Sequence, residues 1–176
     1  MNETTDLSAD LRCLSLLFSY PDEQWAAAPI PHSKGKALLQ EMRDATRVTL
    51  QNEYVRLFIN ALPTLPCPPY GSVFLEGTVM GRSTVELAQR YRAYGLHSTE
   101  MADHIGVECE FLALLSSMRD RSEIAADCAF VTDHLNSWTA PFFDLVEQHD
   151  RLGPYHHCAA FGRQVCAATS RSLLSW

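Results

Sequence analysis

Apolar residues recur at helical spacing along most of the chain. In four segments the leucine, valine, methionine and phenylalanine positions stand three or four residues apart. This spacing places them on one face of an α-helix, because a helix makes one turn in about 3.6 residues. It predicts helices over residues 7–18, 36–60, 100–119 and 122–135.

Cap and turn residues predict further helix boundaries. Ser83 followed by Glu86 fits the capping box S-x-x-E, which predicts a helix start there, and Gly95 fits the position just beyond its end. Pro141 fits the first position of another helix, which opens FFDLVEQHD. A last helix is expected to close the chain over 155–176.

The segment LPCPPYGSVFLEGTVMG, residues 65–81, interrupts this pattern. Three prolines in four residues cannot continue a helix, and SVFLE at 72–76 is typical of a short extended piece. Six or seven helices with short links and almost no strand predict an all-α fold. We therefore expect a single-domain helical bundle over residues 1–176, with a proline-rich loop.

Composition narrows the classes of function. The chain has 176 residues, 47% of them hydrophobic, and a formal net charge of −7. No basic stripe is available to neutralise phosphates, so a nucleic-acid partner is not expected, whereas a basic peptide would suit the charge. The N-terminal segment opens acidic and its apolar run is short and interrupted by Arg12, which fits neither a signal peptide nor a membrane-spanning helix. The expected location is the cytoplasm, without stable membrane insertion.

Neither a metal centre nor an active site is predicted. The six cysteines form no C-x-x-C pair and are expected to be reduced, buried thiols. His156 and His157 are adjacent, so on a helix they point about 100° apart and do not easily share a metal. Cys67 has no evident basic neighbour to lower its pKa. No hydrolase, phosphate-loop or kinase motif is present, so we expect no catalytic residue, no cofactor and no enzyme.

Three features fit either a protein core or a binding surface. The apolar segment YVRLF at 54–58 is typical of a core, but it also suits the floor of a groove. The prolines before Tyr70 are either a stiff connector or a rigid support that presents an aromatic ring at little entropic cost. Asp103 and His104 are expected in the first turn of a helix, where a carboxylate interacts favourably with the dipole. An acidic residue beside an apolar floor would suit a peptide with hydrophobic and basic parts.

The order and spacing of these segments resemble a known family. YVRLF at 54–58, PPYGSV at 68–73 and DHIGVE at 103–108 are similar to motifs of the cytosolic redox-enzyme maturation chaperones, the TorD/DmsD/NarJ group. The resemblance covers about residues 7–176 and is nearest the DmsD-like branch. Met101 stands where relatives often have proline, and Tyr70 stands where the DmsD-like branch often has tryptophan.

The resemblance implies an all-helical protein that binds the twin-arginine leader of a molybdenum-dependent oxidoreductase in the cytoplasm. Such a chaperone holds the precursor until its cofactor is inserted and so delays export; the Tat translocase is a further implied partner. Asp103 is expected to pair with a leader arginine. The residues that match the family's leader-binding positions, with their neighbours, are Tyr54, Leu57, Phe58, Pro69, Tyr70, Asp103 and His104.

Three alternatives stay open at this point. A chaperone of the nitrate-reductase type would act on the enzyme without proofreading a leader. An enzyme without a recognisable motif and a helical adaptor are the other two. The oligomeric state is not predicted.

Overall fold

The computed structural model describes residues 6–118 and 121–173. Within these residues the chain forms nine α-helices, one π-helical turn and no strand, so the predicted all-α class is confirmed. The elements are α1 (Leu7–Leu17), α2 (Glu23–Ala27), α3 (Lys36–Asp44), α4 (Arg47–Tyr54), the π-helical turn η1 (Val55–Ile59), α5 (Gly71–Glu76), α6 (Arg82–Ala93), α7 (Ile105–Ser117), α8 (Arg121–His149) and α9 (Pro154–Leu173).

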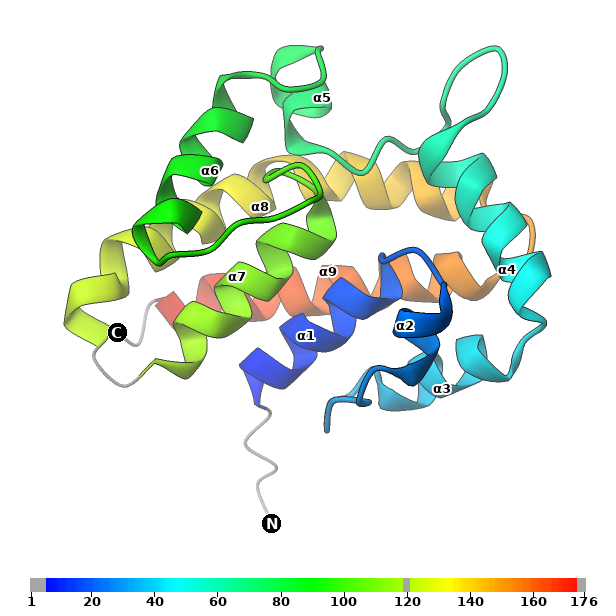
Figure 1. The fold of residues 1–176 in the computed structure, drawn as a ribbon, viewed down its shortest axis with the longest axis horizontal. Coiled ribbons are helices and arrows are strands. Elements are labelled where there is room, and N and C mark those ends of the chain that lie inside the picture. Colours follow the sequence, from blue (N-terminus) through cyan, green and yellow to red (C-terminus); the bar gives the residue numbers. More distant parts are fainter. Residues whose placement is uncertain (1–5, 119–120, 174–176) are drawn as a thin grey trace.

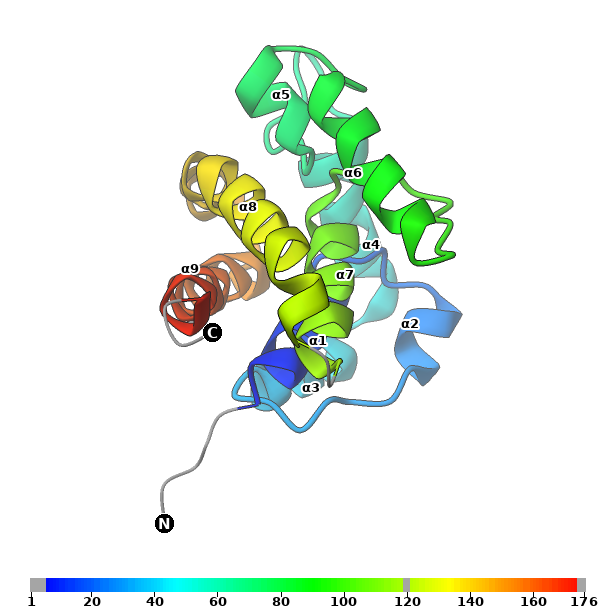
Figure 2. The ribbon, with the colours of Figure 1, turned by 90° about the vertical axis from the view of Figure 1, so that its left-hand side faces the viewer.

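Four long helices form the centre of the molecule (Figures 1 and 2). Helices α8 and α9 lie side by side, α1 packs against α7 and α9, and α7 packs against α8. Helix α5 rests on α8 and leads into α6 on one side of this bundle, while α3 packs on α1 and α9 on the other. The core between these helices is aromatic: its large buried side chains include Trp138, Phe142, Phe143, Phe18 and Tyr155.

The segment 36–60 is not the single helix that its periodicity predicts. The chain leaves the helical conformation at Ala45 and Thr46, whose ψ angles are 158° and 112°. A straight helix of this length would extend about 37 Å at 1.5 Å per residue and could not follow the bundle. The break lets Met42 in α3 and Leu50 in α4 both reach the core, where each is 2% exposed.

Residues 72–76 are helical rather than extended. The carboxylate of Asp103 accepts a hydrogen bond from the Ser72 amide at 2.8 Å, which satisfies a donor in the first turn of α5. Helix α6 begins at Arg82, one residue before the predicted capping box. There Glu76 accepts from the amides of Arg82 and Ser83 at 2.6 and 2.9 Å, so the cap comes from the preceding helix and not from within the box. Gly95, at φ 72°, follows this helix as predicted.

Helix α8 joins two predicted helices into one of 29 residues, and Pro141 lies inside it. The proline is exposed, whereas the nearby Trp138, Phe142 and Phe143 are each 0% exposed. Burial of these aromatic rings outweighs the cost of about 3 kcal/mol for a proline in a helix.

The start of one predicted helix differs from the structure, and two predicted helix ends lie outside the described residues. Helix α7 begins at Ile105 with His104 as its N-cap, so Asp103 and His104 precede the helix instead of forming its first turn. The predicted end at Arg119 lies outside the described residues, as does the end of the last helix at 174–176.

All six cysteine side chains are buried, as predicted. Burial raises the pKa of the Cys67 thiol to about 12, so this residue is not an activated nucleophile. Over residues 6–118 and 121–173, no helix is long and apolar enough to cross a membrane. In the same part of the chain, no three His, Cys, Asp or Glu side chains are grouped so that they could hold a metal ion.

Candidate functional site

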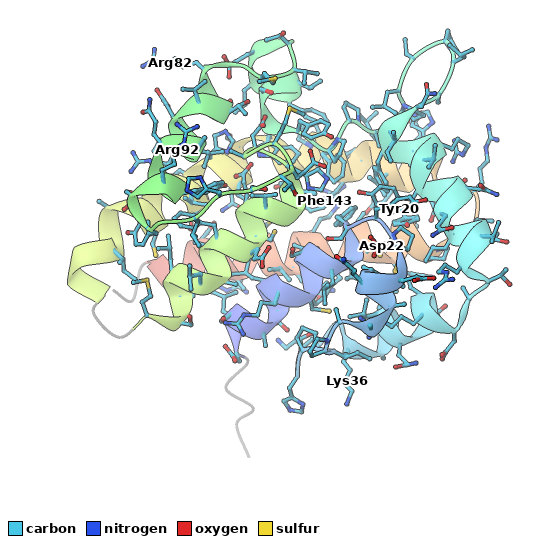
Figure 3. All side chains as sticks on the ribbon, viewed as in Figure 1. Tyr20, Asp22, Lys36, Arg82, Arg92 and Phe143 are labelled. Atoms are coloured by element: carbon cyan, nitrogen blue, oxygen red, sulfur yellow. The ribbon has the colours of Figure 1, made fainter. Side chains whose placement is uncertain are left out.

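A groove of about 550 Å³ opens where the end of α1, helix α2, the η1 turn and the N-terminal end of α7 meet. Its wall near α2 includes Tyr20 and Asp22, whose side chains lie together at the α1–α2 connection (Figure 3). The proline-rich segment forms the opposite wall. Five of the seven residues predicted from the sequence line this groove: Tyr54, Phe58, Pro69, Tyr70 and His104.

The proline-rich segment is fixed to the start of α7 by backbone hydrogen bonds. Tyr70 and His104 form an isolated antiparallel bridge. In this bridge the Ile105 amide donates to the Pro69 carbonyl and the Gly71 amide donates to the Asp103 carbonyl, both at 3.0 Å. The Tyr70 and His104 rings consequently lie 5.4 Å apart in an edge-to-face arrangement. The stiff segment therefore holds Tyr70 against the N-terminal end of α7, where its partly exposed side chain lines the groove.

Leu57 and Asp103 do not line the groove. Leu57 is 0% exposed and belongs to the core. Asp103 is also 0% exposed; one carboxylate oxygen accepts from the Ser72 amide, and the other has no hydrogen-bond partner among the described residues. The expectation that Asp103 pairs with a leader arginine does not fit this position, because the side chain is fully buried and is not part of the groove lining. Asp103 instead caps α5 and so positions the Tyr70–Gly71 turn.

Tyr54 and Phe58 are core residues whose edges reach the groove. Their exposed fractions are 5% and 2%, and their ring centroids lie 4.9 Å apart. The Tyr54 hydroxyl donates to the Phe18 carbonyl at 2.9 Å. The π-helical turn brings Leu57 and Phe58 inwards, and the Cys67 amide ties the proline-rich segment to the Leu57 carbonyl at 3.0 Å. A π-type turn at a lining residue is a common feature of functional sites.

The charged side chains that line the groove are all acidic. Asp22, Glu100 and Glu110 are exposed, no lysine or arginine lines the groove, and none of these carboxylates has an ion pair with a described residue. Glu100 accepts from the Met101 amide at 2.8 Å and more weakly from the Tyr70 hydroxyl at 3.4 Å. Burial, together with the Glu100 charge, raises the pKa of Tyr70 to about 12, so its hydroxyl stays protonated.

Sequence reasoning did not find these carboxylates. Asp22 has the signature of a helix N-cap, which it also is, since it accepts from the Trp25 amide at 2.8 Å. One signal was available for Glu110. It follows Val107 by three residues on α7, so both share a helix face, and both line the groove.

The His104 ring lines the groove and is uncharged at neutral pH. Burial lowers the pKa of its imidazole to about 4, although the Glu100 and Asp103 carboxylates oppose this shift. The neutral ring accepts a hydrogen bond from the Gly106 amide through Nδ1 at 3.0 Å, which caps α7. The ring is therefore held in one orientation beside Tyr70.

A buried polar cluster lies against the Tyr70–Gly71 turn. Glu108 is 0% exposed; its carboxylate contacts His134 Nδ1 at 2.8 Å and accepts from Trp138 Nε1 at 3.2 Å. Gly71 passes so close that a Cβ atom there would lie 2.7 Å from the His134 ring. Only glycine fits this contact, and α5 thereby packs directly on the cluster.

Protonation of this cluster is expected to affect stability. Burial raises the pKa of Glu108 to about 7 from an ordinary 4.5, against the hydrogen bond and charge of His134. Between these values the folded chain holds a proton that the unfolded chain has lost, so Glu108 contributes a stability that falls as pH rises, by about 1.4 kcal/mol per pH unit. His104, with its lowered pKa, has the opposite slope but is common to both chains, so the test is a difference. Against the effect of burial, the Glu108 carboxylate also raises the pKa of His134, which changes the difference in the same direction. The stability of the wild-type chain relative to Glu108→Gln should fall between pH 5 and 7 in urea unfolding, and a constant difference would contradict the assignment.

Comparisons with known proteins agree with this architecture. The family model described as nitrate reductase delta subunit matches residues 27–144. The Tat proofreading chaperone DmsD of Salmonella typhimurium is 28% identical over 195 residues, which cover 96% of this chain and 91% of that protein. The chaperone protein TorD of Vibrio cholerae is 25% identical over 166 residues, covering 86% and 74%.

A solved structure supports the same relationship. A candidate redox enzyme maturation protein from Archaeoglobus fulgidus superposes with a TM-score of 0.65 at 32% identity, over 93% of both chains. The fold, the family model and the two named chaperones all point to one group of non-enzymatic proteins. The chain belongs to the nitrate reductase delta subunit family, among the redox-enzyme maturation chaperones of the TorD/DmsD type.

Proposed function

We propose that this chaperone binds the twin-arginine leader of a molybdenum-dependent oxidoreductase precursor in the cytoplasm and holds the precursor until its cofactor is inserted. The observation that carries the proposal is the groove, which combines an aromatic wall with Asp22, Glu100 and Glu110 and has no lysine or arginine among the described residues that line it. Consecutive arginines followed by an apolar stretch match both properties. Transfer of the released leader to the Tat translocase stays a prediction.

Contact and charge have different roles in this proposal. Tyr70, with the edges of Tyr54 and Phe58, gives an apolar surface, and burying about 300 Å² would contribute about 7 kcal/mol before ordering costs. Arginine pairs with the exposed carboxylates add about 0–1 kcal/mol each, or about 1.5–3 kcal/mol where the peptide shields them from water. Apolar contact therefore sets most of the affinity. The carboxylates discriminate between leaders, because a peptide without the arginines leaves them unpaired.

Removing the charges of Glu100 and Glu110 is expected to weaken leader binding about tenfold. The test uses calorimetry with a synthetic peptide in which two arginines precede a ten-residue run of leucine and alanine. In the double variant Glu100→Gln, Glu110→Gln two pairs are lost, at up to about 1 kcal/mol each. Higher salt should reduce the affinity of the wild-type chain more than that of the variant.

A double variant with the same net charge serves as control. Glu41→Gln, Asp133→Asn removes two exposed carboxylates on α3 and α8, outside the groove, and should leave affinity within about twofold, since distant surface charges are screened. Equal losses in both double variants would mean a general charge effect and would count against the groove. Equal binding of the client enzyme with and without its leader would favour the nitrate-reductase type of chaperone instead.

A further inference from the structure

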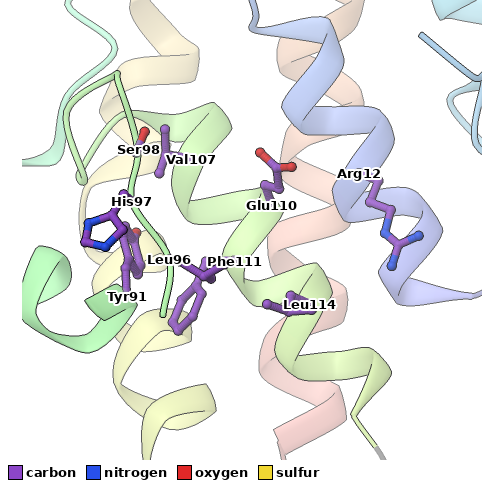
Figure 4. A pocket seen from close by; sticks show the side chains of 9 residues that line it. All are labelled: Arg12, Tyr91, Leu96, His97, Ser98, Val107, Glu110, Phe111 and Leu114. Carbon is purple, nitrogen blue, oxygen red and sulfur yellow. The ribbon is translucent and has the colours of Figure 1, made fainter. Parts of the chain in front are cut away.

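A second hollow, of about 540 Å³, continues from the groove along α7 (Figure 4). Val107 and Glu110 line both spaces. The adjacent residues Ser98 and Thr99 line the hollow and the groove, respectively. One wall is the segment that links α6 to α7, and the other is α1. The two spaces therefore form one surface channel that follows the outer face of α7.

The floor of this hollow is apolar. Val107, Phe111 and Leu114 stand at i, i+4 and i+7 on α7 and so form one stripe. Leu96 faces them from the linking segment, and it is held there because its amide donates to the Tyr91 carbonyl at 3.0 Å. Leu96 and Leu114 are 37% and 36% exposed. Phe111 is 3% exposed, so the exposed apolar surface comes from Leu96, Leu114 and part of Val107. A partly exposed apolar surface with polar residues at its edges is typical of a surface that another chain covers.

Charge is distributed unevenly along the channel. Helix α1 runs antiparallel to α7, since Ser8 Oγ donates to the Ala113 carbonyl at 2.9 Å while Ser15 lies beside Gly106. Asp22 and Glu100 consequently lie at the His104 end. Arg12 belongs to the hollow, where its guanidinium lies between the levels of Glu110 and Leu114 (Figure 4). This exposed arginine would repel the basic part of a peptide from the Leu114 end. The basic part is therefore expected at the other end, beside Asp22 and Glu100.

We propose that this hollow binds the apolar stretch of the leader in helical form, with the arginines at the Glu100 end and the chain running towards Leu114. This inference rests on the proposed function and adds the position, conformation and direction of the peptide. From His104 to Leu114 the floor spans ten residues of helix, about 15 Å. The apolar stretch of a leader, about 7–15 residues, is about 10–22 Å long as a helix, which fits. The same stretch in extended form would be about twice as long.

The test compares two peptides and three variants by calorimetry. One peptide has two arginines and a ten-residue run of leucine and alanine; in the other the run is serine, glycine and asparagine. Leu114→Asp should lower the affinity for the apolar peptide at least tenfold. Leu114→Met, which keeps an apolar side chain, should bind this peptide within twofold of the wild-type affinity. Val85→Asp on α6 is the matched control, because Val85 is 53% exposed and lines neither space. It should also stay within twofold.

The outcomes separate this inference from the proposed function. If Leu114→Asp binds the apolar peptide as tightly as the wild-type chain while Glu100→Gln, Glu110→Gln weakens it, the leader binds but its apolar stretch lies elsewhere. If the wild-type chain binds neither peptide, the proposed function fails, and the inference fails with it. Photo-crosslinking from position 114 should label the apolar run and from position 100 the arginine end; the reverse pattern would overturn the direction.

Discussion

Phe58→Ala is expected to lower the free energy of unfolding by about 3–5 kcal/mol, the range for removing a large aromatic side chain from a core. Phe58 is 2% exposed and packs edge-on or tilted against four rings, with centroid distances of 5.9 Å to Phe18, 4.9 Å to Tyr54, 6.2 Å to Phe142 and 5.2 Å to Tyr155. Three of these neighbours come from other helices, so the cavity cannot close by a local shift. Urea unfolding followed by far-UV circular dichroism measures the loss, and the melting temperature should fall by about 10 °C or more.

Ile59→Ala is the control for this prediction. Ile59 is the next residue in the same π-helical turn but is 55% exposed, so its replacement should cost less than about 1 kcal/mol. If the two variants were equally stable, Phe58 would not be part of the core. The comparison also affects binding experiments. A loss of leader binding in Phe58→Ala would reflect a disturbed groove floor, whereas Tyr70, which is partly exposed, tests direct contact.

The fold class could be predicted because it depends on local signals. Apolar periodicity identified α1, α7 and the first part of α8, and Gly95 marked the end of α6. The boundaries that differed depend on contacts from outside the helix concerned. Asp103 caps α5 across 31 residues and Glu76 supplies the cap of α6, and neither contact leaves a local pattern. Pro141 is tolerated within α8 because the adjacent Phe142 packs against rings far away in the sequence, those of Phe18 and Phe58.

The sequence indicated which segments of the chain come together at the candidate site, but it did not indicate which side chains face the groove. The motifs at Tyr70 and His104 do meet, through the bridge between their backbones. The motif could not show that Asp103 is buried. An aspartate that caps a helix and an aspartate that faces a ligand look the same in an amino-acid sequence. The exposed carboxylates Glu100 and Glu110 belong to no motif. Their role depends on the groove, which exists only once α1, α2 and α7 are assembled.

Glu53→Ala is expected to destabilise the chain by about 3 kcal/mol, towards the lower end of the range for leaving a buried ion pair without one partner. Glu53 is 6% exposed and accepts from Arg56 at 2.5 and 2.8 Å and from the Arg151 amide at 2.8 Å. Arg56 also donates to the His149 carbonyl at 2.5 Å. These bonds fix the end of α4 and the η1 turn to the α8–α9 connection, and Arg56 would keep only one of its partners. Thermal and urea unfolding give the change.

The Glu23–Arg47 pair provides the control, and pH provides a second check. At 3.8 Å, with side chains 89% and 50% exposed, this surface pair should cost less than about 1 kcal/mol when Glu23 is replaced by alanine. Burial alone would raise the pKa of Glu53, but the hydrogen bonds from Arg56 and Arg151 outweigh it and hold the pKa below its ordinary value. The folded chain then releases this proton more readily than the unfolded chain, so the stabilisation is present above about pH 4.5 and is lost as pH falls through the folded pKa. The advantage of the wild-type chain over Glu53→Gln should therefore shrink below pH 4.5. An advantage that stayed constant down to pH 3 would mean that the charge of Glu53 does not stabilise the contact between the η1 turn and the α8–α9 connection.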